Sequence, residues 1–317
     1  MGEMDNVTPK RGFITIATGD ARYYQMALNL LHSYRLNGNA DYPFAILCDR
    51  ICPEAQEFDD IILMEEPTRS FLDKLALYRY APYEETIFID ADCLVLQDVS
   101  VYWEELSAMD DFCCYGRKLP LESREGWFYY EDMGDLKPLI KHGISLQGGV
   151  YYLRKTDRCR AIFEKAIELT KVYDRYSFYY FSQPADEPVL ALSMVLTDCD
   201  PCPVAILDRI AVLPGNERRF RVSANGALFL DKKPCSASVV HFGNRNLNRF
   251  LYRYCLSLIN HRLQGKKIKH TYPKYLACKV KYFPAEAKHR VKKLLRKSLS
   301  KDAFRYLKQH LPSKLRR

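Results

Sequence analysis

The chain has 317 residues, 48% of them hydrophobic, and a formal net charge of +9 at pH 7. This length and apolar content suffice for one large globular domain or two small ones and exclude a disordered chain. No apolar run approaches the roughly 20 residues of a membrane span, and residues 1–11 lack the apolar core of a signal peptide. Eleven cysteines, an odd number scattered along the chain, indicate free thiols in a reducing cytosol, so we expect a cytoplasmic protein.

Short apolar segments alternate with amphipathic ones over the first 80 residues. The expected strands are residues 13–17, 43–47 and 61–64, and the expected helices are residues 23–37, ending at Gly38, and residues 71–80. Alternation of this kind predicts an α/β fold with a mostly parallel sheet and helices on its faces.

Two carboxylates stand one residue apart directly after an apolar run. Ile87 to Ile89 have the β-branched and aromatic content of a buried strand, and Asp90 and Asp92 follow them. Ligands of α/β sheets bind beyond the carboxyl ends of the strands, which is where Asp90 falls. A divalent cation held by such carboxylates offsets the charge of a diphosphate. The pattern therefore indicates a metal-diphosphate site; the alternative is an acidic turn that only caps another element.

Residues 110–135 are rich in aromatic and charged side chains and contain three glycines and a proline. This composition predicts a long ordered loop, and long loops in compact domains are usually functional. We expect this loop to form a wall or lid of a binding cleft. The alternative is ordinary packing of bulky side chains.

The positive charge is concentrated at the end of the chain. Residues 262–317 hold 19 Lys and Arg against Glu286 and Asp302, a net charge of +17, so residues 1–261 carry −8. We expect a folded domain over residues 1–261 and a basic helical tail over residues 262–317. The tail has apolar residues at helical spacing opposite a basic face, which suits an anionic membrane surface better than nucleic acid. Alternatively, the apolar stripe packs on the domain.

Five segments resemble GT-A glycosyltransferases, most of all glycosyltransferase family 8, the family of glycogenin and of bacterial lipopolysaccharide galactosyltransferases. The matching segments, in order, are residues 12–23 (first strand and nucleotide loop), 74–99 (which include Asp90 and Asp92), 147–153 (acceptor-side strand), 186–190 and 241–243 (late histidine motif). An ordered set is far more specific than one motif. The resemblance implies one Rossmann-like GT-A catalytic domain with a mostly parallel mixed sheet over residues 1–261.

The resemblance also implies the site residues. The donor would be contacted by Ala17, Thr18, Asp20, Tyr23, Lys74, Asp90 and Gln147, and a metal ion would be held by Asp90, Asp92 and His241. An imidazole beside two carboxylates favours Mn²⁺ over Mg²⁺. For Lys74 the alternative is a solvated surface lysine, and for His241 it is a structural histidine.

Glu187 departs from the family pattern, which commonly has Gln at this position. A retaining enzyme would use this carboxylate to form a glycosyl-enzyme or to stabilise an oxocarbenium-like transition state, with Asp186 holding donor hydroxyls or positioning the acceptor. An inverting enzyme would use a carboxylate here as general base. The resemblance favours retention.

The function implied is metal-dependent transfer of a sugar from a nucleotide-diphosphate donor, UDP-linked, to an acceptor hydroxyl of a glycan or a lipid-linked acceptor, in glycan, lipopolysaccharide or capsule synthesis. One alternative is an inactive GT-A fold that serves as a lipid- or nucleic-acid-binding module through its basic tail. A sugar nucleotidyltransferase is another, but it needs a Gly-rich basic loop after the first strand, and residues 15–23 contain one Gly and one Arg.

Overall fold

The computed structural model describes residues 10–38, 41–176, 178, 184–214, 216, 219–223, 226–243 and 246–265. The chain divides into two compact units, residues 1–244 and residues 245–317. The only helix described in the second unit is α7 (Phe250–Leu263). The predicted amphipathic helix of the tail lies outside the described residues, and the predicted domain boundary after residue 261 stays a prediction.

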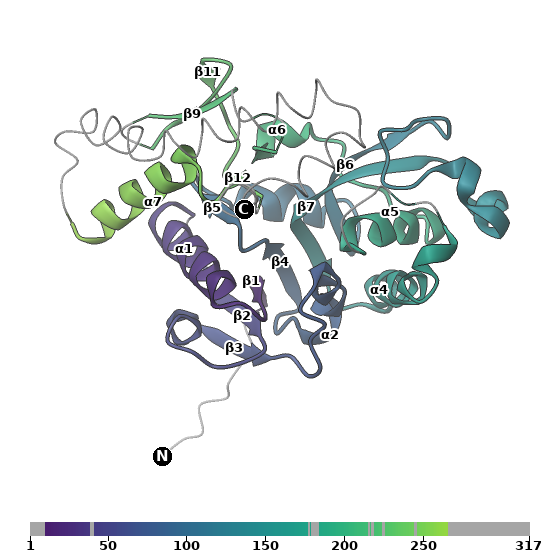
Figure 1. The fold of residues 1–317 in the computed structure, drawn as a ribbon, viewed down its shortest axis with the longest axis horizontal. Coiled ribbons are helices and arrows are strands. Elements are labelled where there is room, and N and C mark those ends of the chain that lie inside the picture. The colour runs from purple at the N-terminus through teal and green to yellow at the C-terminus, as the bar shows by residue number, and fades with distance from the viewer. Residues whose placement is uncertain are drawn as a thin grey trace, which may run out of the picture. The chain divides into compact units, whose positions relative to one another are not determined.

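A six-stranded sheet forms the centre of the first unit (Figure 1). Its strands, in spatial order, are β3 (Asp60–Leu63), β2 (Phe44–Cys48), β1 (Arg11–Ala17), β4 (Glu85–Ile89), β7 (Gly143–Arg154) and β6 (Phe112–Leu119). β7 pairs antiparallel with both of its neighbours, β4 and β6, whereas the remaining pairs of this sheet are parallel. The five strands other than β7 therefore run in one direction. The predicted mostly parallel mixed sheet is therefore confirmed.

The remaining strands of this unit, among the described residues, form two three-stranded sheets. One has the order β5 (Cys93–Val95), β12 (Val239–His241), β8 (Ile210–Val212), and the other has the order β11 (Lys233–Pro234), β10 (Leu228–Leu230), β9 (Phe220–Val222). In the first of them, β12 runs antiparallel to β5 with His241 opposite Cys93. This pairing brings the end of the domain back to the acidic residues that follow β4.

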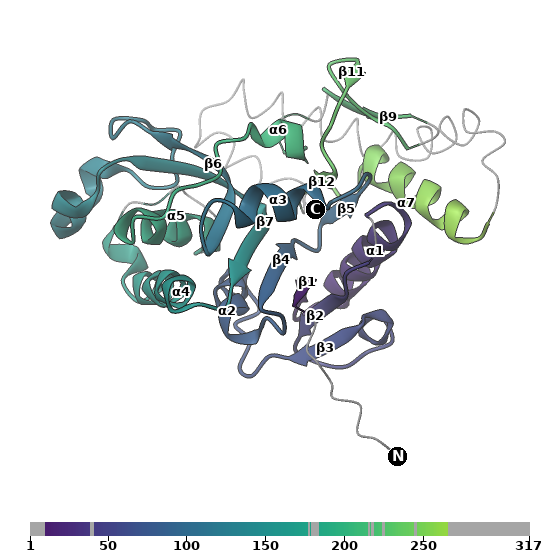
Figure 2. The ribbon, with the colours of Figure 1, turned by 180° about the vertical axis from the view of Figure 1, so that it is seen from behind.

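The helices of the first unit are short apart from α1, α4 and α5. The α-helices are α1 (Ala21–Asn37), α2 (Leu77–Tyr80), α3 (Val101–Ser107), α4 (Asp157–Thr170), α5 (Asp186–Leu196) and α6 (Ile206–Arg209). The 3₁₀ helices are η1 (Ala55–Glu57), η2 (Phe71–Ala76), η3 (Tyr130–Asp132), η4 (Gly134–Leu139) and η5 (Tyr173–Arg175). Figures 1 and 2 both show α4 and α5 together beside β7, with α1 beside β1.

The alternation of side chains along the strands builds a separate core on each face of the sheet. On one face, Phe13 packs against Tyr34 of α1 and Trp103 of α3, with ring centroids 4.9 and 5.3 Å apart. On the other face, Phe88 of β4 stacks on Tyr151 of β7 at 5.5 Å, within the apolar cluster that includes α4 and α5. The second face carries the candidate site.

The predicted strands of the first 80 residues are confirmed within one or two positions, and so is the first helix. Gly38 caps that helix by donating its N–H to the Tyr34 carbonyl at 2.7 Å. The helix predicted over residues 71–80 is present in two parts, η2 and α2. No helix in the described part of the chain is long and apolar enough to cross a bilayer, and the ten cysteines described there carry free thiols.

The loop predicted over residues 110–135 is wrong for its first part, which forms β6. Phe112 to Tyr115 are fully buried, and β6 pairs with β7 over nearly its whole length. At Gly116 the register shifts, and a Cβ there would lie 2.6 Å from the Ser145 carbonyl oxygen, so only glycine fits. Burial of this continuous apolar run, with Phe112 against Phe163 of α4 and Cys114 against Met194 of α5, outweighs the loop-like composition of the residues that follow it.

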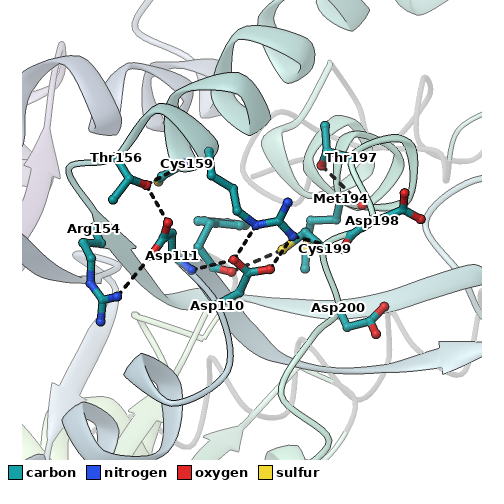
Figure 3. A network of polar contacts seen from close by, with 12 residues as sticks. Asp110, Asp111, Arg154, Thr156, Cys159, Met194, Thr197, Asp198, Cys199 and Asp200 are labelled. Atoms are coloured by element: carbon teal, nitrogen blue, oxygen red, sulfur yellow. Dashed lines mark hydrogen bonds and ion pairs between the residues drawn. The ribbon is translucent and has the colours of Figure 1, made fainter.

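A polar network fixes the start of α4 to the start of β6 (Figure 3). The Arg158 guanidinium donates two hydrogen bonds of 2.7 Å to the Asp110 carboxylate. Thr156, the N-cap of α4, and Arg154 donate to the Asp111 carboxylate at 2.7 and 3.1 Å. Burial alone would raise the pKa of Asp110, but the Arg158 charge and hydrogen bonds outweigh it and hold the pKa below its ordinary value.

We expect Asp110→Asn to cost about 1 kcal/mol of stability at pH 7, because it removes the charge from a bidentate pair in which Asp110 is mostly buried and Arg158 is half-exposed to screening solvent. A carboxylate with a lowered folded-state pKa stabilises the protein above its unfolded pKa, about 3.9, and loses that effect as pH falls through the folded value. The difference in melting temperature from wild type should therefore be constant from about pH 5 to 8 and shrink below about pH 4. Thermal melts across pH test this. The control is Glu65→Gln, because the ion pair of Glu65 with Arg79 is exposed. A pH-independent difference would contradict the electrostatic account.

Candidate active site

Lys74 connects the residue after β4 with the start of α5. Its ammonium lies 2.8 Å from an Asp90 carboxylate oxygen and 3.4 Å from one of Asp186. It also donates to the Gly148 carbonyl of β7 at 3.4 Å. The side chain is only 12% exposed, so the alternative of a solvated surface lysine is wrong. Burial alone would lower the pKa of Lys74, but the charges of Asp186 and Asp90 raise it well above its ordinary value, and the ammonium stays charged.

The first turn of α5 presents two acidic side chains to this ammonium, the buried Asp186 and the partly buried Glu187. Asp186, nearly fully buried, accepts a 2.7 Å hydrogen bond from the Tyr151 hydroxyl of β7. Glu187 accepts one of 2.8 Å from the Gly148 backbone N–H. Burial, and next the charge of Asp186, raise the pKa of Glu187 to about 7, against the opposing charge of Lys74. Glu187 is thus held with one oxygen fixed by the backbone.

Asp92 and His241 come together because β12 pairs with β5. The Nε2 of His241 lies 3.0 Å from the Oδ1 of Asp92. Burial alone would lower the pKa of His241, but the charge of Asp92 outweighs it and raises that pKa to about 9. The same pairing keeps the pKa of Asp92 below its ordinary value despite burial. Asp90 is close enough for its charge to act on both.

The donor set fits a divalent cation. Asp92 Oδ1 has its ion pair with His241 Nε2 but no hydrogen bond of good geometry, and His241 Nδ1 is buried without a hydrogen bond within the described ranges of the chain. A buried nitrogen in this state is rare unless it has a ligand. Asp92, Cys93 and His241 each offer one ligand atom within 4.8 Å of the other two. Carboxylate and imidazole donors suit Mn²⁺ and Zn²⁺.

Four of the seven residues expected to contact the donor lie at the end of β1 and the start of α1. Ala17 is buried at the end of β1, and the Thr18 hydroxyl donates to Asp73 of η2 at 2.7 Å. Asp20 is the N-cap of α1 and accepts from the Arg22 backbone N–H at 2.9 Å. The Arg22 guanidinium lies 4.9 Å from the Tyr23 ring centroid. This loop therefore presents Asp20 and Tyr23 outward, while Thr18 faces η2.

Gln147 lies on β7, one residue before the two glycines that face the site. Its side-chain oxygen accepts from the Gly149 backbone N–H at 3.2 Å, and the residue is largely buried. The structure thus uses the Gln147 carbonyl to shape the strand beside the site. Its role toward the donor stays a prediction.

Three residues of the site were not predicted: Asp73, Tyr151 and Cys93. Asp73 accepts from Thr18, Thr68 and the Arg69 backbone, which fastens η2 to the end of β1. A signal for it exists, because Ser70 and Asp73 stand at capping-box spacing at the start of η2. Tyr151 and Cys93 lie inside strands and gave no local signal.

No protein-family model matches the chain, and no curated protein matches it in sequence. Solved structures do match it. The galactosyltransferase LgtC, with donor and acceptor sugar analogues, is 14% identical, covers 81% of this chain and 96% of its own, and has a TM-score of 0.54. An active-site mutant of LgtC is 15% identical, covers 74% of this chain and 87% of its own, and has a TM-score of 0.49. Mouse xyloside xylosyltransferase 1 is 10% identical, covers 74% of this chain and 98% of its own, and has a TM-score of 0.47. The match to LgtC shows that the chain has the GT-A glycosyltransferase fold that its motifs predicted.

Replacing Lys74 by Met should lower stability by about 3–5 kcal/mol, because it leaves Asp90 and Asp186 without their shared counter-charge. In a chain of this size we expect the melting temperature to fall by about 6–10 °C. Added Mn²⁺ should recover part of this loss, since a cation near Asp90 replaces the missing charge. Melting curves with and without Mn²⁺ measure both effects. The control is Lys118→Met, because the ion pair of Lys118 with Asp200 is exposed. Equal melting temperatures for the two variants would contradict a buried counter-charge.

Proposed function

We propose that the chain is a glycosyltransferase that moves a sugar from a nucleotide-diphosphate donor, UDP-linked, to an acceptor hydroxyl with retention of configuration. The observation that supports this most is the convergence of one buried ammonium and four acidic side chains at the end of β4 in a GT-A fold. Ligands of α/β sheets bind at this edge. LgtC, which has the same fold, was solved with donor and acceptor sugar analogues.

A divalent cation, Mn²⁺ before Mg²⁺, would be held by Asp90, Asp92 and His241. When bound, it makes the nucleoside diphosphate a better leaving group by offsetting the charge that develops on it. Lys74 adds a fixed positive charge, because its ammonium lies between Asp90 and Asp186 at the edge where the phosphates would lie. Ala17, Thr18, Asp20, Tyr23 and Gln147 are proposed to bind and orient the nucleotide half of the donor.

Glu187 is proposed to act at the anomeric carbon. Its carboxylate oxygen bonds to that carbon as the bond from carbon to the phosphate oxygen breaks, and the electron pair leaves with the diphosphate. The acceptor oxygen then displaces the carboxylate, and its proton passes to the leaving diphosphate or to water. The 2.8 Å hydrogen bond from the Gly148 N–H fixes one carboxylate oxygen and leaves the other for this step. Asp186, held by Tyr151 and Lys74, is suited to orient donor or acceptor hydroxyls.

The intact site argues against a catalytically inactive fold. A purely structural role would give no reason to gather the largely desolvated charges of Lys74, Asp186 and Glu187 beside the Asp92–His241 pair, because charges removed from water cost stability. For the acceptor, we propose a glycan or a lipid-linked sugar at an anionic membrane surface. This rests on the +17 charge of residues 262–317, most of which lie outside the described residues.

Mn²⁺ and UDP together should raise the melting temperature of the wild-type protein, and Asp92→Ala should abolish that rise. A ligand at about 100 times its Kd stabilises the folded state by about 2.7 kcal/mol, which is several degrees. Glu164→Ala, an exposed site on α4, is the matched control and should keep the rise. No rise in wild type with Mn²⁺ and any nucleoside diphosphate would remove the metal-diphosphate site.

Glu187→Gln should lose about 100-fold or more in sugar transfer while it keeps the donor-induced rise in melting temperature. Gln retains an oxygen for the Gly148 N–H, so this variant removes charge and nucleophilicity without disturbing the fold. Initial rates with a panel of nucleotide sugars, together with the melts, measure both quantities. Glu168→Gln, exposed on α4, serves as control. Turnover of Glu187→Gln within a few fold of wild type would return Glu187 to a structural role.

A further inference from the structure

We propose that Cys93 supplies a thiolate ligand to the ion site of Asp92 and His241, so that this site also binds a thiophilic divalent cation such as Zn²⁺ or Cd²⁺. This goes beyond the proposed function, for which oxygen and imidazole ligands suffice. It extends the same ion site but does not depend on sugar transfer.

The placement of Cys93 follows from strand pairing. Cys93 is the first residue of β5 and lies opposite His241 of β12. Its neighbour Asp92 directly precedes the strand, and Asp92 Oδ1 lies 3.0 Å from His241 Nε2. One ligand atom from each of the three residues lies within 4.8 Å of the other two. Two backbone segments about 150 residues apart in sequence thus bring a carboxylate, a thiol and an imidazole together.

The donor atoms of this cluster are buried and poorly satisfied. The Oδ1 of Asp92, whose side chain is 9% exposed, has the 3.0 Å ion pair with His241 Nε2 but no hydrogen bond of good geometry, and His241 Nδ1 is buried without a hydrogen bond, both judged over the residues that the structure describes. The Cys93 thiol is fully buried, and it makes a long contact of 3.9 Å with the Gly149 carbonyl oxygen. Buried polar atoms in this state are costly unless a ligand satisfies them.

Gly149 lets the backbone of β7 approach the same atoms closely. A Cβ on Gly149 would lie 3.1 Å from His241 Nδ1 and 3.6 Å from Cys93 Sγ. Any side chain at this position would crowd the imidazole and press against the sulfur. The glycine therefore allows Cys93 and His241 to pack against β7 without displacement.

The ligand types determine which cation fits. Zn²⁺ binds Cys sulfur at about 2.3 Å and His nitrogen or carboxylate oxygen at about 2.0–2.2 Å in a tetrahedron, so two ligand atoms of one ion are about 3.5 Å apart. The three atoms must therefore draw together by about 1 Å, which side-chain rotation can supply. On binding, the Cys93 S–H bond breaks, the proton passes to water and the sulfur binds as a thiolate. Mn²⁺ and Mg²⁺ prefer oxygen donors and would leave the thiol protonated.

Titration of the metal-free, full-length protein with Co²⁺, a spectroscopic substitute for Zn²⁺, tests the assignment. We expect a near-ultraviolet thiolate-to-Co²⁺ absorption band with one thiolate per ion, which Cys93→Ser and Asp92→Ala lose. Cys113→Ser, from a fully buried thiol on β6, should keep the band. Zn²⁺ affinity should fall at least about 10-fold in Cys93→Ser, whereas Mn²⁺ affinity should stay within about two-fold.

Absence of the band in the wild type, or its persistence in Cys93→Ser, would overturn the proposal. If Cys93→Ser does not fold, X-ray absorption on the wild-type protein with one equivalent of Zn²⁺ decides: a sulfur neighbour at about 2.3 Å that Asp92→Ala removes supports the assignment, and a shell of oxygen and nitrogen alone contradicts it. No sugar nucleotide is present in either measurement, so the result is separate from the test of sugar transfer.

Discussion

The buried ammonium of Lys74 is the interaction on which the rest of the site depends. It joins three parts of the fold, because its partners are Asp90 after β4, Asp186 at the start of α5 and the Gly148 carbonyl of β7. The ring of Phe88 lies 5.6 Å below it and closes the apolar side. An ammonium in such a place is stable only because two carboxylates offset its desolvation. Its position therefore fixes the mutual positions of those carboxylates.

The helix that carries Lys74 is itself fastened to the loop after β1. Asp73, the preceding residue, accepts hydrogen bonds from the Thr18 hydroxyl and from Thr68, at 2.7 Å and 2.6–2.7 Å. A displacement of the loop after β1 would therefore be transmitted to η2, and through Lys74 to Asp90 and Asp186. Short charge-assisted hydrogen bonds of this kind resist such displacement. The loop after β1 and the acidic residues after β4 are thus held as one rigid arrangement.

What could be predicted from the sequence was the part set by local pattern. The strand before Asp90, α1 with its Gly38 cap and the parallel pairing of the first strands all follow from hydrophobic period and capping residues. The late histidine motif pointed to His241, but the fact that His241 faces Cys93 depends on pairing between distant segments, which no local period encodes. The burial of Lys74 was equally invisible, since its own segment has the pattern of a surface helix. The strand β6 was missed for a related reason: only four of its residues form an apolar run, inside a segment with the composition of a loop.

The charge balance of the site supports the proposal that a cation and a diphosphate bind there together. Among the residues that the structure describes, Asp90, Asp92, Asp186 and Glu187 interact with two cationic side chains, Lys74 and His241. A diphosphate donor brings at least two further negative charges, and a site with an excess of carboxylates would repel it at these short distances. A divalent ion on Asp90, Asp92 and His241, as proposed, would offset those two charges and leave the net charge of the site as it is without ligands. The carboxylates would then make donor binding conditional on the ion, while Lys74 keeps the same carboxylates from destabilising the fold when the ion is absent.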